Sequence, residues 1–277
     1  MYSRSRVLFA IIACVGTTAA AQQAPSGSVP LAAVSPWEVD FAETQCVASR
    51  DFGSKADPTS IAIRPPFFEG DSYEIFVARA GKGPPHGEEL KGTVDFGRGP
   101  IKAWLLRFTS TDKTLAFWTF RLSEADMAQA RSASFMHLRG GASLDASFTL
   151  TSVAAVMDQL EACTTALMRH WNWGPQSETP IVQQPFGDVR SIFSSDDFPR
   201  EAMHYGQEGA AQFVLLVDEQ GKVAGCHVVL TSGIPVFDAM GCSVLKQRAR
   251  YRPAADGRGR PIRSMVVTPK VVWRIAP

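Results

Sequence analysis

The sequence predicts an α+β protein: an N-terminal antiparallel β-rich domain with a long C-terminal helix, then a small domain with a three-stranded antiparallel sheet and two helices. Three observations predict this. Short β-prone segments recur between Gly/Pro turns up to residue 150. A single long apolar stripe at helical spacing follows. After a Pro- and Gln-rich stretch, the last part of the chain alternates strands and short helices.

The chain is expected to divide into five segments. They are a signal peptide (1–21), a disordered N-terminus (22–36), a β-rich exported domain (37–173), a Pro/Gln linker (174–190) and a C-terminal domain (191–277). The 277 residues are enough for two domains, and a net charge of +1 does not favour nucleic acid as a partner.

The N-terminus has the features of an export leader. Arg4 and Arg6 precede an apolar run at 7–15, and a small-residue site ends at Ala21. The run is shorter than the roughly 20 residues that span a bilayer. We therefore expect cleavage after Ala21 and a periplasmic protein; an uncleaved, inner-membrane anchor is the alternative.

The first domain is expected to hold several short strands, which favours an antiparallel sheet, sandwich or partial barrel. They fall at 60–64, 73–80, 92–97, 101–109, 114–122, 135–138 and 147–150. A helix at 152–171 follows, and Cys163 lies on its apolar stripe.

The second domain is expected to start with a short helix at 198–206, because Pro199 suits a first turn and Gly206 an ending. Strands at 211–217 and 222–230, a helix at 236–250 and a strand at 264–275 complete it.

These residues, in this order, resemble the C-terminal domain of the TonB family of energy transducers. The resemblance rests on Phe198-Pro199-x-x-Ala202, Gly209, Asp218-x-x-Gly221-Lys222-Val223, Ser232-Gly233, Phe237-Asp238, Tyr251-Arg252-Pro253-Ala254, Gly259-Arg260-Pro261 and a Val-rich strand ending at Trp273. The family usually has Tyr at the position of Phe198 and Leu-Asp at that of Phe237-Asp238.

In this family the last strand takes up an extended segment of a TonB-dependent outer-membrane receptor, so the resemblance implies binding by strand addition. Simple alternation turns Met265, Val267, Val271, Trp273 and Ile275 toward the helices. It turns five residues outward as the partner-binding edge: Val266, Thr268, Lys270, Val272 and Arg274. Pro269 lacks an N–H and fits an edge strand or a bulge. A second copy of the chain is an alternative occupant, which would make a homodimer.

Four cysteines remain after the leader, and an exported chain meets an oxidising compartment. Three pairings are open, and pairing within domains selects Cys46–Cys163 and Cys226–Cys242. Buried free thiols are the alternative. A metal site is disfavoured because no Cys-x-x-Cys occurs and His227 is the only nearby imidazole.

Basic residues concentrate near the end of the chain. A docking patch for an acidic partner would comprise Arg248, Arg250, Arg252, Arg258 and Arg260; a solvated helix face and loop is the simpler interpretation.

No nucleophile elbow, zincin helix, P-loop or dinucleotide fingerprint occurs, so no catalytic residue or cofactor is assigned. We expect a non-enzymatic, periplasmic protein-binding protein with an outer-membrane receptor as its candidate partner. The alternatives are a TonB-type energy transducer with a retained N-terminal anchor, and a hydrolase in the first domain.

Overall fold

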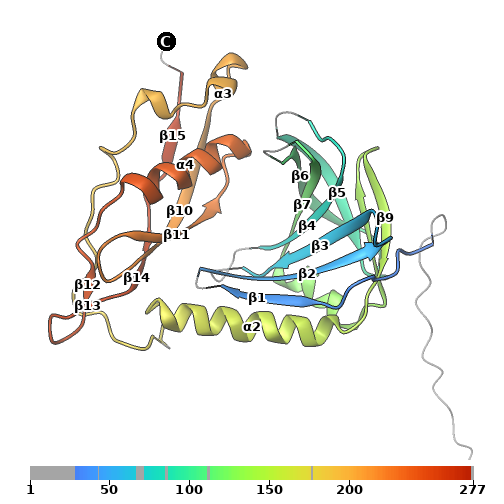
Figure 1. Cartoon of the computed structure of the whole chain (residues 1–277), viewed down its shortest axis with the longest axis horizontal. Coiled ribbons are helices and arrows are strands. Elements are labelled where there is room, and N and C mark those ends of the chain that lie inside the picture. The colour runs from blue at the N-terminus through green and yellow to red at the C-terminus, as the bar shows by residue number, and fades with distance from the viewer. Residues whose placement is uncertain are drawn as a thin grey trace, which may run out of the picture.

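The computed structural model describes residues 29–42, 44–66, 72–84, 87–110, 113–175 and 177–275. It is a mixed α/β structure with mostly antiparallel sheets and few helices, built as a larger β-rich domain and a smaller C-terminal domain (Figure 1). The expected leader at 1–21 lies outside the described residues. None of the described helices is long and apolar enough to cross a membrane.

The larger domain is a nine-stranded sheet in which every neighbouring pair is antiparallel. The strand order is β1-β2-β3-β4-β7-β6-β5-β8-β9. The bounds are β1 Glu38–Ala42, β2 Gln45–Gly53, β3 Pro58–Arg64, β4 Tyr73–Ala80, β5 Glu88–Asp95, β6 Ile101–Thr109, β7 Leu115–Leu122, β8 Phe135–Gly140 and β9 Leu144–Thr149. Short helices α1 (Glu124–Met127) and η1 (Ala128–Ser132) join β7 to β8.

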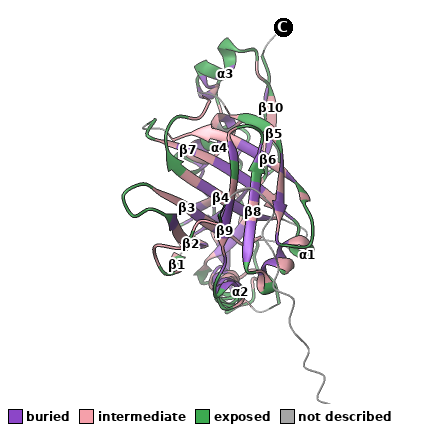
Figure 2. Ribbon diagram, turned by 90° about the vertical axis from the view of Figure 1, so that its right-hand side faces the viewer, coloured by how far each residue is buried: buried purple, intermediate pink, exposed green. Residues whose placement is uncertain are grey.

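Alternating apolar residues build the core of this domain. Ile61 and Ile63 of β3, and Ile75 and Val77 of β4, lie two residues apart in their strands, are buried, and face the inside of the curled sheet. Figure 2 shows that buried residues concentrate in these strands, whereas α3 of the other domain is largely exposed. The helix α2 (Val153–His170) lies across one end of the curled sheet (Figure 1).

Part of the segment expected to be disordered, residues 22–36, is hydrogen-bonded to the sheet. The Leu31 N–H donates to the Ser147 carbonyl of β9 (2.7 Å), and the Gly53 N–H of β2 donates to the Ala32 carbonyl (2.8 Å). The segment therefore connects β9, the last strand in the sheet order, with β2, the second strand from the other end. The expectation of disorder was wrong here because backbone pairing does not require apolar composition.

The smaller domain contains η2 (Ser195–Asp197), α3 (Arg200–His204), β10 (Gly209–Val217), β11 (Val223–Leu230), α4 (Pro235–Arg248), β12 (Ala254–Ala255), β13 (Pro261–Ile262), β14 (Ser264–Val267) and β15 (Val271–Trp273). Its main sheet has the order β11-β10-β14, and β15 also pairs with β10. β12 and β13 form a separate small ribbon.

The helix α4 covers one face of this sheet. Phe213 and Leu215 of β10 share a buried cluster with Phe237 and Leu245 of α4. Gly241 permits the close approach, since a Cβ there would lie 2.3 Å from the Phe213 ring. The helix can therefore pack directly on the strand.

The opposite face of the sheet packs toward the larger domain. Val214 and Leu216 of β10 and Met265 of β14 belong to the buried cluster that fills the larger domain. The Asn172 side chain, just after α2, donates to the Arg263 carbonyl (2.9 Å). The two domains thus share a continuous apolar core.

Both expected disulfides are present. Cys46 of β2 is bonded to Cys163 of α2, and Cys226 of β11 to Cys242 of α4. Their sequence separations are 117 and 16 residues. In the chain-entropy model, closing loops of these lengths stabilises by about 5 and about 3 kcal/mol.

The expected linker, 174–190, is not free along its length. The Val182 and Gln183 N–H groups donate to the Ala255 carbonyl (2.9 and 3.0 Å), and Phe186 exchanges two backbone hydrogen bonds with Arg252. Residues 182–186 therefore lie alongside the β12–β13 ribbon as a third extended segment. Pro and Gln content did not indicate this, because the bonds come from the backbone alone.

Candidate partner-binding edge

The last strand of the main sheet is split in two by a bulge. β10 pairs with β14 through Val214↔Val267 and with β15 through Ala211↔Val271. Three steps along β10 (214 to 211) therefore face four steps along the last strand (267 to 271), so that strand contains one extra residue. Such an insertion is a β-bulge, and it reverses which side chains face which way.

Thr268 fills the gap that the bulge leaves. Its N–H donates to the Phe213 carbonyl (2.9 Å), and its hydroxyl accepts from the Phe213 N–H (3.2 Å). The Gln212 side chain donates to the Thr268 carbonyl (2.8 Å). Pro269 follows directly, at the break between the two pieces, where its missing N–H is not needed by β10.

Because of the bulge, the prediction was wrong for two of the five residues expected to face outward. Val266 packs against the helix-side cluster, and Thr268 is only 2% exposed. The three beyond the bulge, Lys270, Val272 and Arg274, are exposed. The alternation predicted from sequence holds only for β15, since the extra residue shifts β14 by one position.

The inward set changes in the same way. Val271 and Trp273 of β15 pack on the helix side as expected. Met265 packs instead into the cluster on the opposite face, and Val267 is 45% exposed. Ile275, expected to face inward, is also exposed (39%).

The outer side of β14 and β15 is an open sheet edge. Both pieces pair with β10, and among the described residues no strand pairs with their other side. Unpaired N–H and C=O groups along such an edge form a template for another extended chain.

An apolar groove of about 450 Å³ runs beside this edge. Its apolar lining is Phe193, Phe198, Met203, Val271, Val272, Trp273 and Ile275, and its polar lining is Ser194, Ser195, Asp197 and Arg274. Trp273 packs against the groove wall: its ring lies edge-on to the Phe193 ring, with the two ring centroids 6.4 Å apart. Sequence reasoning missed the wall formed by 193–198, because only the folded chain brings it to β15.

An ion pair between the buried Asp197 and the half-exposed Arg248 holds that wall in place. Arg248, at the end of α4, donates to both carboxylate oxygens of Asp197 (2.7 and 2.9 Å), and the Ser194 N–H donates to the same carboxylate (2.8 Å). Burial disfavours the charged form of Asp197, but the hydrogen bonds from Arg248 and Ser194 outweigh burial and hold its pKa below the usual value.

The predicted docking patch is only partly available. Arg248 is committed to Asp197, and Arg260 pairs with Asp256 (2.8 Å). Arg252 lies over the Phe186 ring, 5.8 Å from its centroid. Arg250 and Arg258 are exposed. Two of the five guanidinium groups are thus neutralised by carboxylates.

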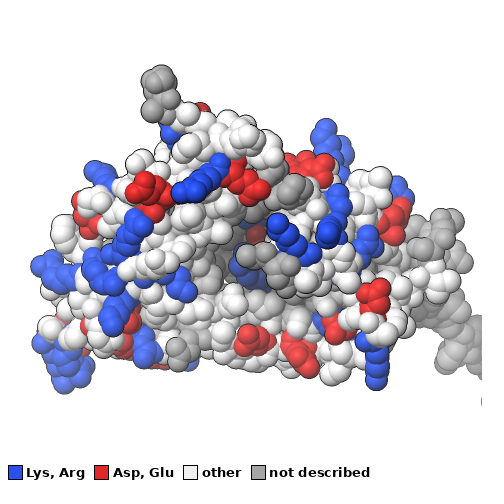
Figure 3. All heavy atoms as spheres, turned by 45° about the horizontal axis from the view of Figure 1, so that its top comes forward, with Lys and Arg blue, Asp and Glu red and all other residues white. Residues whose placement is uncertain are grey.

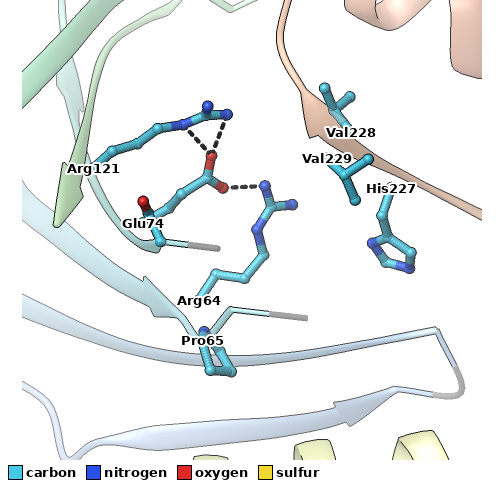
Figure 4. Close-up of a pocket in the computed structure, with 8 residues that line it drawn as sticks. Arg64, Pro65, Glu74, Arg121, His227, Val228 and Val229 are labelled. Atoms are coloured by element: carbon cyan, nitrogen blue, oxygen red, sulfur yellow. Dashed lines mark hydrogen bonds and ion pairs between the residues drawn. The ribbon is translucent and has the colours of Figure 1, made fainter. Parts of the chain in front are cut away.

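A second, smaller pocket lies between the domains, with about 30 Å³ of space, enough for one water molecule (Figure 4). Glu74 of β4 lies there between Arg64 and Arg121, and Arg121 binds the Glu74 carboxylate at 2.9 Å. Burial, with the nearby Arg64 charge, lowers the pKa of His227 to about 4, so its imidazole is neutral at pH 7.

This charged cluster lies beside β11, the other outer strand of the sheet. His227, Val228 and Val229 of β11 line the pocket opposite Arg64 and Arg121. Charged side chains next to an edge strand discourage pairing with another chain. The larger domain thus lies against β11 at residues 227–229, whereas among the described residues no strand pairs with the outer side of β14 and β15.

The described residues hold no group of three or more His, Cys, Asp or Glu side chains that could bind a metal ion. Comparison with curated proteins found no match. Residues 195–275 match the family model described as Gram-negative bacterial TonB protein C-terminal. The match spans η2 through β15, so the resemblance to the TonB C-terminal domain is confirmed for these residues, which include the open edge and all of the groove lining except Phe193 and Ser194.

Proposed function

We propose that this protein is a non-enzymatic, periplasmic binding protein that takes up an extended segment of another protein along the outer edge of β14 and β15. The observation that carries the proposal is the open edge beside an apolar groove in a TonB-like domain. Backbone hydrogen bonds to β15 supply affinity, and side chains that enter the groove supply selectivity.

The family resemblance suggests the partner class: an extended segment of a TonB-dependent outer-membrane receptor. A partner strand would present every second side chain to the groove side of the sheet, over Trp273 and Val271. The other side chains would lie beside Val272, which is 52% exposed. A second copy of this chain, paired edge to edge, is the competing occupant.

The test uses the full-length mature protein, a set of synthetic peptides that together cover the sequence of an outer-membrane receptor, and hydrogen exchange. On binding, we expect slowed amide exchange at β15 and no change at β11. Val272→Lys places a charge on the edge and should abolish binding. Leu230→Lys is the matched control, since Leu230 is 40% exposed on the opposite edge strand.

Binding with unchanged exchange at β15, or equal loss in both variants, would refute strand addition. Protection at β15 that depends on protein concentration without any peptide would instead identify the homodimer. Sedimentation of the protein alone separates these two results.

The match to the TonB family model also favours a second candidate, an energy transducer that keeps its leader as an inner-membrane anchor. N-terminal sequencing of the protein from cells distinguishes them. A chain that starts at Gln22 supports the periplasmic binding protein, and an intact Met1 supports the transducer.

A further inference from the structure

A ribbon with basic and apolar side chains lies at the end of the C-terminal domain that is opposite the groove. It comprises residues 182–186 and 250–260, which the backbone bonds at Ala255 and Arg252 hold together. Figure 1 places β12, β13 and their connecting loop at the end of the domain opposite the C-terminus. Figure 3 shows that Lys and Arg side chains gather over this domain.

Two large apolar side chains project from this ribbon. Val182 is 71% exposed and Phe186 is 68% exposed. Among the large apolar side chains of the described residues, only that of Val29 has a higher exposed fraction than these two. Val182 lies next to the loop, within 3.8 Å of where a Cβ at Gly257 would be. Neither side chain contributes to a buried cluster, so their exposure needs another explanation.

The charge around these side chains is positive. Between 250 and 260 there are four Arg residues and one acidic residue, Asp256, a net of +3. Asp256 is buried and binds Arg260 and the N–H groups of the loop. The Arg252 guanidinium lies over Phe186, and Arg258 is exposed at the loop with no ion pair among the described residues.

We propose that this ribbon docks the domain on an anionic membrane surface. Phe186 and Val182 would enter the headgroup layer, while Arg252 and Arg258 bind lipid phosphates. Guanidinium groups suit phosphate geometry, and apolar side chains flanked by basic ones are typical of interfacial binding. In an anionic bilayer the phosphates and the apolar acyl region lie directly next to each other, so one surface would accommodate both the basic and the two projecting apolar side chains. The proposal does not depend on strand addition, because the ribbon and the groove are separate surfaces.

The test is flotation of the full-length mature protein with phosphatidylcholine vesicles, with or without about one third phosphatidylglycerol. We expect binding to the anionic vesicles only, weakening as salt rises. The double variant Arg252→Gln/Arg258→Gln should lower vesicle partitioning at least tenfold, roughly what two lost basic contacts predict. Phe186→Ser should lower it severalfold.

Matched controls come from the other domain. Phe41→Ser removes an apolar side chain that is 62% exposed, and Lys55→Gln/Lys102→Gln removes two exposed charges. Both should bind like the wild type. If Arg252→Gln disturbs folding, seen as a lower thermal midpoint, Arg258→Gln alone still tests the charge contribution.

Three results would overturn the proposal. One is equal binding to both vesicle types, and a second is wild-type binding by the Arg and Phe186 variants. The third is binding to soluble polyglutamate without vesicle flotation, which would assign the ribbon to an acidic protein.

Discussion

Trp273 of β15 stacks on Phe237 of α4, with ring centroids 4.9 Å apart and planes 14° from parallel. The contact joins the open edge strand to the helix that covers the sheet. Trp273 is 5% exposed and also borders the groove. The same side chain therefore stabilises the domain and forms the surface that a partner would meet.

Trp273→Ala should destabilise the protein by about 3 kcal/mol, because it removes a buried aromatic ring and leaves a cavity beside Phe237. Urea unfolding of the full chain measures this. The control is Val272→Ala on the same strand, whose side chain is half exposed and should cost less than about 1 kcal/mol. Equal losses for both variants would contradict the proposed role of the stack.

Asp197→Asn tests the ion pair that holds the groove wall. The variant leaves Arg248 without its carboxylate, and we expect a loss of about 1 kcal/mol, since Arg248 is 45% exposed and solvent screens the pair. The folded-state pKa of Asp197 is lowered, so its stabilisation is present above the pKa of the unfolded chain and disappears as the pH falls through the folded-state pKa.

The difference between wild type and Asp197→Asn should therefore be present at pH 7 and vanish in strong acid. Unfolding measured across that range checks this, with the exposed Asp188→Asn as a control that should show no difference at either pH. A difference that persists in strong acid would mean that the pair is not the cause. Peptide binding should weaken in Asp197→Asn alone.

The sequence predicted the features whose cause lies in a short stretch of chain. Cys163 falls on the apolar stripe of its helix, and its bond to Cys46 followed from the domain division. Two strands, 38–42 and 45–53, were missed. In β2 two of the three buried side chains, Cys46 and Ala48, are small, and in β1 no residue is buried, so neither strand carries a clear alternation of large apolar residues.

The candidate site was predicted in outline only. Pro269 indicated an edge strand or a bulge, but a proline does not reveal which neighbour is the extra residue. Thr268 was therefore placed on the outside although its hydroxyl is bonded to Phe213. The groove wall at 193–198 depends on the pairing of Asp197 with Arg248, which are 51 residues apart. Contacts at that separation leave no periodic pattern in the sequence.

His227 should make the contact between the domains sensitive to acid. Its folded-state pKa of about 4 lies below its usual 6.5, mainly through burial and then through the charges of Arg64 and Lys246; a hydrogen bond with the Thr44 backbone opposes the shift. In the unfolded chain His227 binds a proton more readily, so stability falls as the pH drops from about 6.5 to about 4. The full shift corresponds to roughly 3 kcal/mol.

Replacing His227 with Gln removes this titration. The free energy of unfolding of His227→Gln should change less between pH 7 and pH 4 than that of the wild type. His204→Gln, at an exposed position on α3, should leave the wild-type pH dependence unchanged. If His227→Gln and the wild type show the same acid sensitivity, carboxylates elsewhere cause it.

Thr268→Val tests whether the bulge positions the open edge. The variant keeps the shape of the side chain but removes the hydroxyl that accepts from the buried Phe213 N–H. An unsatisfied buried donor costs about 1–3 kcal/mol. Thr268→Ser keeps the hydroxyl and is the matched control; its loss should be smaller, and it should retain peptide binding. Because the bulge sets which side chains of β15 face the groove, Thr268→Val should also weaken peptide binding, measured by titration calorimetry under conditions where the variant stays folded. Full binding by a destabilised Thr268→Val would show that the bulge supports the fold without shaping the edge.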